Sequence, residues 1–431
     1  MNISSRLDRG FAFVLLCALL TVLTVDFVSP TEGEAAARRV RRATVSPSQR
    51  SAATPRTFAA GTGTQRSPYV IRTAAQLSAF AASVNNGEAY AGKYIRLGAD
   101  IDLKDVVWVP IGFYREDGGT RPFRGFFDGG GFTIYGMGSG NDPRRPAGAL
   151  FGALDGAAAD NVSLQFVNVT GGVNVGGLVG FMTGSSLKNC RVSGTVTGQA
   201  AVGGIAGAAL KGFMENCHFS GNVVGESGVG GLAGAVDHVA IRFCKTEGQV
   251  EGNVDVGGFV GGILNGIIVE SAADRVIVHG ERNIGGLAGN MIDGGRIERA
   301  VFNGQVIGNS FIGGVVGRMT DGIVTGCTVT GSVKGRAQAG GLAGELAGGE
   351  IRGSASAATV DGMANLGGVV GRMSGGMLRN NANSGTVIGG EGVGGLIGNF
   401  TGGDPDFSSN RSSGQAREQS KTGALVGIQT P

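Results

Sequence analysis

A five-residue pattern, two glycines, two apolar residues and a third glycine, returns every 27 or 28 residues along most of this chain. Copies begin at residues 176, 203, 230, 257, 285, 313, 340, 367 and 394. Two variants, at residues 148–152 and 423–427, carry alanine in the second position, as is typical of terminal repeats. A constant period over the last two-thirds of 431 residues predicts a solenoid in which each repeat is one coil.

Each repeat contains three short apolar segments separated by Gly, Asn, Ser or Thr. None of them has the length or spacing of a helix, and 84 glycines disfavour a helical protein. We therefore expect an all-β parallel β-helix with three short strands per coil of about 27 residues, each strand pairing with its equivalent ~4.8 Å away. A β-propeller is disfavoured because its blades need about 40 residues.

The motif glycines have a predicted structural role at one corner of the coil. We expect them to accept the positive φ of a tight turn and to let neighbouring coils approach closely. We do not expect them to form a phosphate loop or a binding site. The glycines assigned this role are Gly176, Gly177, Gly180, Gly203, Gly204, Gly230 and Gly231.

Four cysteines support the register, because each lies fourteen residues after the first glycine of its repeat: Cys190, Cys217, Cys244 and Cys327. We expect a column of small side chains at another corner. Neighbouring in-register strands suit stacking better than bridging, which favours free buried thiols over disulfides. No two cysteines lie two to four residues apart, so the spacing is not that of a zinc site. No cofactor or metal is expected.

The first 58 residues are predicted to be a signal peptide and a linker. Arg6 and Arg9 precede the apolar run 11–25, and the alanines at 35–37 predict cleavage before Arg38; an uncleaved membrane anchor is the alternative. Residues 38–58 carry six arginines and no acid, typical of a disordered basic linker. The net charge of +3 leaves −1 for residues 59–431, which excludes nucleic acid as an expected partner.

Residues 59–147 are predicted to form an N-terminal cap with the first irregular coils, before the repeats at 148–427 and a tail at 428–431. Thr73 and Gln76 predict a helix start, and Gly87 predicts its end. Leu77 and Phe80 share a face with Val84. This amphipathic helix would cover the open end of the solenoid.

Three motif copies, at 176–180, 230–234 and 394–398, resemble the GLUG motif of bacterial surface proteins. The segment 59–147 also resembles the one that often leads into those repeats. The resemblance implies a right-handed β-helix, found in adhesin-like proteins and in non-catalytic regions of immunoglobulin-A-cleaving metalloproteases. His218, His238 and His279 form no His-Glu-x-x-His site, so the protease chemistry is not expected.

Two pairs of residues are candidates for chemistry. Asp293 and Asp321 lie eight residues after their motif glycines on adjacent coils, so they could form a carboxylate pair of a polysaccharide-degrading enzyme. Each precedes glycine, and the simpler interpretation is a turn. Trp108 and Tyr114 lie in the longest polar insertion and could stack on sugar rings; the simpler interpretation is that they pack the cap.

These observations predict an exported, non-enzymatic surface or secreted protein that binds host cells, extracellular matrix or glycans. A polysaccharide-degrading enzyme is one alternative. A passive envelope or matrix component, self-associating through the C-terminal edge of the solenoid, is the other.

Overall fold

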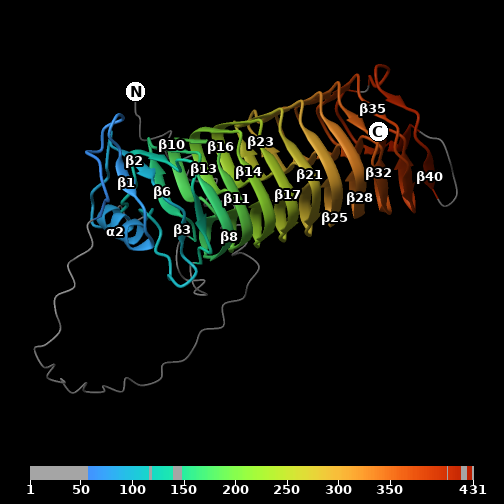
Figure 1. Cartoon of the computed structure of the whole chain (residues 1–431). Helices are drawn as coiled ribbons and strands as arrows, with labels where there is room; N and C mark the ends of the chain where they lie inside the picture. The colour runs from blue at the N-terminus through green and yellow to red at the C-terminus, as the bar shows by residue number, and fades with distance from the viewer. Residues whose placement is uncertain (1–56, 116–118, 139–147, 405, 419–424, 430–431) are drawn as a thin grey trace, which may run out of the picture.

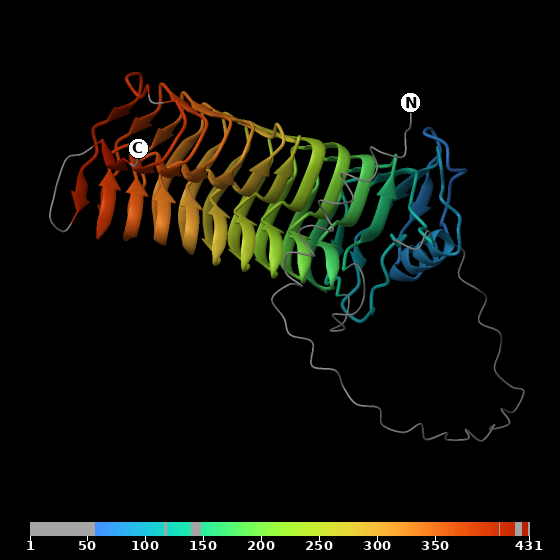
Figure 2. The same ribbon diagram turned by 180° about the vertical axis from the view of Figure 1, so that it is seen from behind.

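The computed structural model describes residues 57–115, 119–138, 148–404, 406–418 and 425–429, which form a long rod of stacked coils (Figures 1 and 2). The predicted signal peptide and nearly all of the predicted linker lie outside the described residues. Phe58 stacks on Tyr69 with ring centroids 4.2 Å apart, so the folded part includes the last residue assigned to the linker. No helix of the described segments is long and apolar enough to cross a membrane.

All strand pairings between coils are parallel, and they build two sheets that run the length of the rod. Positions within a coil are counted from its first motif glycine, which is position 0. The strand that starts at position +3 forms one ladder of the first sheet, made of β6 (Phe151–Asp155), β10 (Val179–Lys188), β13 (Ala206–Glu215), β16 (Ala233–Arg242), β19 (Val260–Leu264), β23 (Ala288–Ile292), β26 (Val316–Met319), β29 (Ala343–Leu346), β33 (Val370–Met373), β38 (Ile397–Phe400) and β41 (Val426–Gln429).

The second ladder of this sheet lies near position +11. It starts in the N-terminal segment and passes through the second halves of β10, β13 and β16. Its other strands are β1 (Tyr69–Ile71), β2 (Tyr94–Leu97), β4 (Phe126–Asp128), β7 (Ala158–Asp160), β20 (Ile267–Val269), β24 (Arg296–Glu298), β27 (Ile323–Thr325), β30 (Glu350–Arg352) and β34 (Met377–Arg379). The stack of coils therefore begins well before the first motif copy.

The second sheet carries the rest of each coil. Its first ladder consists of β3 (Ile101–Asp102), β5 (Thr133–Tyr135), β8 (Ser163–Thr170), β11 (Arg191–Thr197), β14 (His218–Val224), β17 (Lys245–Glu251), β21 (Ala272–His279), β25 (Val301–Gly313), β28 (Thr328–Gly340), β31 (Ala355–Ser356), β32 (Thr359–Gly367), β35 (Ala382–Asn383), β36 (Val387–Gly389), β39 (Arg411–Ser412) and β40 (Ala416–Glu418). Its second ladder, which ends at position 0, consists of β9 (Val173–Gly176), β12 (Ala200–Gly203), β15 (Ser227–Gly230), β18 (Val254–Gly257), β22 (Arg282–Gly285), the ends of β25, β28 and β32, and β37 (Glu391–Gly394).

The register confirms that one motif repeat is one coil. Val202 pairs with Val229, and Gly203 pairs with Gly230, one repeat further on. The coil that begins at Gly203 has the predicted three strands, β13, β14 and β15. Later coils split the first strand, as in β19 and β20, or join the last two, as in β25. The predicted parallel β-helix is confirmed.

The core consists of apolar side chains that recur once per coil. In the coil of Gly176, Val175, Leu178 and Met182 are 0% exposed, and so are Leu187 and Val196. Stacked equivalents make one continuous core along the rod. Burial of such a side chain contributes about 1.5–3 kcal/mol, which identifies the source of the rod's stability.

Helix α2 (Ala74–Asn85) begins and packs as predicted. Thr73 Oγ1 accepts from the backbone N–H of Gln76 at 3.2 Å. The chain leaves the helix through Gly87, whose φ is +110°. Phe80 contacts the ring of Phe123 edge-on at 5.6 Å, and α2 lies at the N-terminal end of the rod in both ribbon views (Figures 1 and 2). The helix therefore covers the start of the core.

The motif glycines are explained by close packing alone, which corrects half of the prediction. None of the glycines predicted for this role has a positive φ. A Cβ on Gly203 would lie 2.1 Å from the carbonyl oxygen of Ala206, and one on Gly204 would lie 2.3 Å from that of Gly231, the same position one coil on. The backbone leaves no room for a side chain.

Positive φ values recur instead at other positions of the coil, mainly −2, +8 or +9, +13 and +18. Asn174, Asp255 and Asn283 occupy the −2 column with φ of 55° to 58°. Most residues at −2, +8 and +13 with positive φ are not glycine, and Asn and Asp accept this conformation at low cost. The turns of the coil thus depend on these positions.

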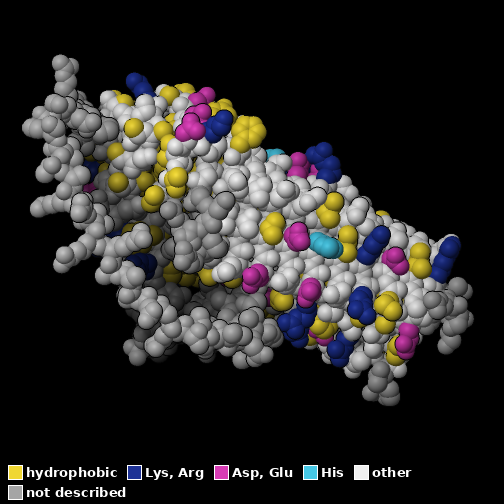
Figure 3. All heavy atoms as spheres, turned by 90° about the horizontal axis from the view of Figure 1, so that it is seen from below, with side chains coloured by type: hydrophobic (Ala, Val, Ile, Leu, Met, Phe, Trp, Pro, Cys, Tyr) yellow, Lys and Arg dark blue, Asp and Glu magenta, His cyan; other side chains and the backbone are white. Residues whose placement is uncertain are grey.

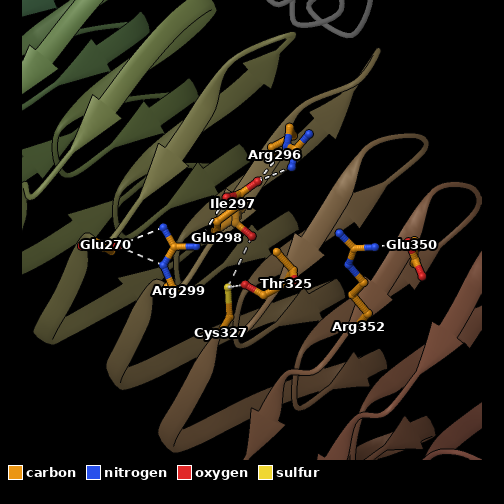
Figure 4. Close-up of polar contacts among 9 residues, drawn as sticks. All are labelled: Glu270, Arg296, Ile297, Glu298, Arg299, Thr325, Cys327, Glu350 and Arg352. Carbon is orange, nitrogen blue, oxygen red and sulfur yellow. Dashed lines mark hydrogen bonds and ion pairs between the residues drawn. The ribbon is translucent and has the colours of Figure 1, made fainter.

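The cysteine column agrees with the prediction, since all four cysteines of the repeats are free and buried. Each thiol donates to backbone carbonyls inside the coil; the Cys327 thiol lies 3.6 Å from the oxygens of Ile297 and Thr325 (Figure 4). Burial raises the pKa of Cys327 to about 11. These groups fill space and are shielded from reaction.

Candidate binding surface at the motif corner

The structure separates the two predicted aromatic residues. Trp108 is 1% exposed, and its indole N–H donates to the carbonyl oxygens of Ala149 and Leu150. A ligand outside the coil cannot reach this ring, so Trp108 packs the cap. Tyr114 is partly exposed and lies against Phe181 on the outer face of β10, with ring centroids 4.6 Å apart.

The predicted carboxylate pair lies in exposed turns. Asp293 follows β23 with a φ of 48°, in the left-handed +8 column, and Asp321 follows β26. Both residues are exposed. This placement agrees with the turn interpretation.

A different surface, which the sequence interpretation missed, lies at the motif corner. The side chain at position −2 of one coil lies beside the side chain at position +5 of the next coil, because the corner folds the two strands toward each other. Asp255 at −2 accepts a hydrogen bond from Asn290 at +5 of the following coil, as well as one from Asn283 Nδ2 at 2.7 Å. We call these two columns the motif corner.

The motif corner is a re-entrant part of the surface. Asp255 is 9% exposed, Asn283 is 7% exposed and Glu345 is 4% exposed, although none of them belongs to the core. Ala208 and Ala235, at position +5 of earlier coils, are also buried outside the main core. Side chains that point out of the coil become buried in this way where the surface is concave and backbone lies on both sides of them.

The C-terminal half of the corner is polar and contains a cluster of two arginines around one glutamate. Arg318 Nε donates to Glu345 Oε2 at 2.8 Å, and Arg372 Nη1 lies 3.6 Å from Glu345 Oε1. The Arg318 guanidinium also lies 5.9 Å from the centre of the Phe311 ring at position −2. Both arginines are about 40% exposed, so they form the rim over a buried carboxylate.

Burial raises the pKa of Asp255, and the hydrogen bond from Asn283 opposes that effect. Hydrogen bonds from amide donors and the more distant charge of Arg282 stabilise the carboxylate and lower its pKa. Its environment favours hydrogen bonding over ion pairing.

Unpaired acceptors concentrate in this corner. Among the described residues, six buried side-chain polar atoms have no hydrogen-bond partner, and four of them are Oδ1 atoms of asparagines at positions −2 or +5: Asn174, Asn283, Asn290 and Asn399. Each such atom costs about 1–3 kcal/mol when it is left without a partner. Folded proteins rarely keep such groups without a reason.

Apart from Asn174, the N-terminal half of the corner carries alanine, glycine and Phe181. Beside it, Leu264 and Ile292 at position +7 form a small cluster with Ala235 on the outer face of β16, β19 and β23. Tyr114 and Phe181 extend this character toward the cap. The corner therefore changes from small apolar side chains to polar ones along the rod.

Other faces show ordinary solvated charge. On the face drawn in Figure 3, basic and acidic side chains are interspersed along the rod. Exposed ion pairs such as Arg299–Glu270 (2.9 Å) and Arg352–Glu350 (3.4 Å) lie on the ladder of β20, β24, β27 and β30 (Figure 4). Such pairs contribute about 0–1 kcal/mol each and mark no site.

No group of three or more His, Cys, Asp or Glu side chains within the described ranges could hold a metal ion. The geometry offers hydrogen-bond acceptors, amide donors and an ion-pair cluster at the corner. That arrangement can bind a polar ligand.

Comparisons with known proteins match the motif and, separately, larger parts of the chain. Residues 171–197 match the family model for the GLUG motif, which confirms the resemblance seen in the sequence. Halomucin of Haloquadratum walsbyi is 35% identical over 146 residues, which are 32% of this chain and 2% of that protein. The chain thus spans a very small share of this relative.

A crystal structure from Bacteroides ovatus, described as a proposed immunoglobulin A1 protease, aligns over 87% of each chain. The sequence identity is 16% and the TM-score is 0.32. A superposition of this quality carries no argument about activity.

Proposed function

Starting from a chain that carries GLUG-motif repeats in a parallel β-solenoid, we propose that it is an exported, non-enzymatic surface or secreted protein that binds host cells, matrix or glycans. The matched motif and the similarity to Halomucin support the coarser part, a repeat protein of the surface or secreted kind. The basic start and apolar run of residues 1–37 support export.

The observation that carries the binding function is the motif corner. It places buried polar side chains in two columns that continue from coil to coil, with four acceptors unpaired. A solenoid creates an extended surface of this kind because each coil presents the same positions to the outside. The length of the motif corner suits an elongated ligand.

The test is a binding screen of the whole chain beginning at Arg38, on a glycan array and on cultured epithelial cells. We expect saturable binding to at least one glycan class or cell surface. Heat-denatured protein controls for nonspecific adhesion of the basic segment. An absence of saturable binding in both formats would contradict the proposal.

A further inference from the structure

The strongest feature without an assigned role is the set of unpaired acceptors in the motif corner. Asn283 is 7% exposed, and its Nδ2 is committed to Asp255 Oδ1 at 2.7 Å. A carboxylate accepts hydrogen bonds, so the amide nitrogen must face Asp255 and the Oδ1 must face away. The orientation of this amide is therefore set by chemistry.

Asn290 repeats the arrangement from the neighbouring column. Its amide also hydrogen-bonds to Asp255, and its Oδ1 is buried without a partner. Further along the rod, Asn399 presents another buried Oδ1 without a partner at position +5. The corner from Asn283 to Asn399 thus holds buried carbonyl acceptors without partners, and a ligand whose hydrogen-bond donors reach them when the amides turn outward would satisfy them.

Charge in the corner does not favour a polyanion. From residue 255 to residue 399, the two columns contain two acidic side chains, Asp255 and Glu345, and two basic ones, Arg318 and Arg372. Glu345 offsets one of the two arginine charges that face it, and Asp255 offsets the other only in the sum over the corner. The corner as a whole is neutral and has no excess positive charge to attract a polyanion.

The direction of the columns determines the shape of the ligand. Equivalent positions repeat every ~4.8 Å along the rod, so a chain parallel to the axis meets the same pair of columns at each coil. Hydroxyl groups both donate and accept, which suits a surface of asparagine acceptors and arginine donors. The partly exposed Phe311 beside Arg318 adds an apolar contact of the kind that a sugar ring uses.

We propose that the motif corner between Asn283 and Asn399 binds a neutral, hydroxyl-rich glycan chain laid along the rod axis. This inference rests on the proposed binding function and gives it a ligand class and a site.

The test compares two double variants of the whole chain beginning at Arg38. Asn290→Ala/Asn399→Ala removes two unpaired acceptors of the corner. Asn189→Ala/Asn216→Ala removes the same atoms from an exposed asparagine ladder at position +13, where Asn216 Nδ2 donates to Asn189 Oδ1 at 2.8 Å. Titration calorimetry uses neutral hexasaccharides of glucose, mannose and xylose, with oligogalacturonate, heparin and an extended serine-rich peptide as the other probes. Thermal unfolding verifies that both variants fold.

We expect at least one neutral hexasaccharide to bind, and the corner variant to weaken that binding about tenfold while the ladder variant leaves it unchanged. Equal affinity of both variants would overturn the assignment of the site while leaving glycan binding intact. Binding of the anionic probes or the peptide alone would overturn the ligand class. Binding to none of the probes, together with a negative cell screen, would overturn the proposed function itself.

Discussion

The most direct test of the motif's physical role is a single methyl group in the middle of the rod, the substitution Gly257→Ala. A Cβ at this position would lie 2.0 Å from the carbonyl oxygen of Val260 and 2.7 Å from that of Leu287. Real Cβ atoms stay beyond 3.0 Å, so two strands must separate by about an ångström. Neither contact is with a side chain that could rotate away.

Overpacking of this kind costs about 1–3 kcal/mol, and rigid backbone on both sides favours the upper end. Replacing glycine also lowers the conformational entropy of the unfolded chain, which offsets about 0.4–1 kcal/mol of that loss of stability. We therefore expect Gly257→Ala to lower the free energy of unfolding by about 2–2.5 kcal/mol. The matched control is Gly138→Ala, because the nearest atom to its Cβ is Asn168 O at 3.6 Å and no positive φ is involved.

The assay is urea unfolding followed by far-ultraviolet circular dichroism, with hydrogen exchange to locate the damage. The control should change stability by less than about 0.5 kcal/mol. Exchange should rise mainly in the coils beside residue 257, because each coil contacts only its neighbours. Equal unfolding midpoints for the two variants would refute the close-packing explanation of the motif.

Four further predictions concern the other columns. Gly228→Asn, in the left-handed −2 column with no atom closer than 3.6 Å to a Cβ, should change the urea midpoint little, whereas Gly228→Val should cost about 1–2 kcal/mol; equal losses would contradict this assignment. Burial raises the folded pKa of Asp255, so the contribution of Asp255 to the free energy of unfolding falls as pH rises above the unfolded pKa of about 3.9. The stability of Asp255→Asn relative to wild type should therefore increase between pH 3 and pH 7, and an unchanged difference in urea midpoints would argue against this. Cys327 should resist iodoacetamide at pH 8 until urea unfolds the chain, as mass spectrometry would show; rapid labelling of the native protein would count against its burial. Neither wild type nor Asp293→Asn/Asp321→Asn should release reducing ends from polygalacturonate; release by wild type that the double variant loses would revive the enzyme alternative.

The architecture was predictable because the spacing between motif copies gives the length of one coil. An apolar residue before each glycine pair and another eleven residues on, such as Val202 and Met214, become core positions once the coils are stacked. The helix was predictable for a similar reason, since Thr73 and Gln76 are local signals that need no knowledge of the rest of the fold. Local and periodic patterns of this kind can be recognised in the sequence without knowledge of the fold.

The conformation of the motif glycines was not predictable, because close approach demands glycine and positive φ also favours it. Only the folded backbone separates the two causes. The −2 column shows the signal that was available: Asn174, Asp255, Asn283 and Asn365 all lie two residues before a glycine pair. Asn and Asp at a fixed offset indicate a left-handed turn residue.

The motif corner was missed because its two columns are far apart in sequence. Asp255 and Asn290 lie on different coils, and their contact depends on how sharply the motif folds one strand against the next. Burial of outward side chains is a property of the cross-section of the rod. A pattern of period 27 indicates which residues stack, and it does not indicate that cross-section.

The central claim is that each motif copy begins one coil, so that equal positions form straight columns along the rod. Asn189 and Asn380 are exposed and occupy position +13 of the coils that begin at residues 176 and 367, seven coil steps apart. With cysteine and a nitroxide label at both positions, pulsed electron spin resonance should give a distance of ~34 Å, seven times the spacing between strands. A distance below ~20 Å, or a broad distribution without a maximum near ~34 Å, would contradict the stacked solenoid.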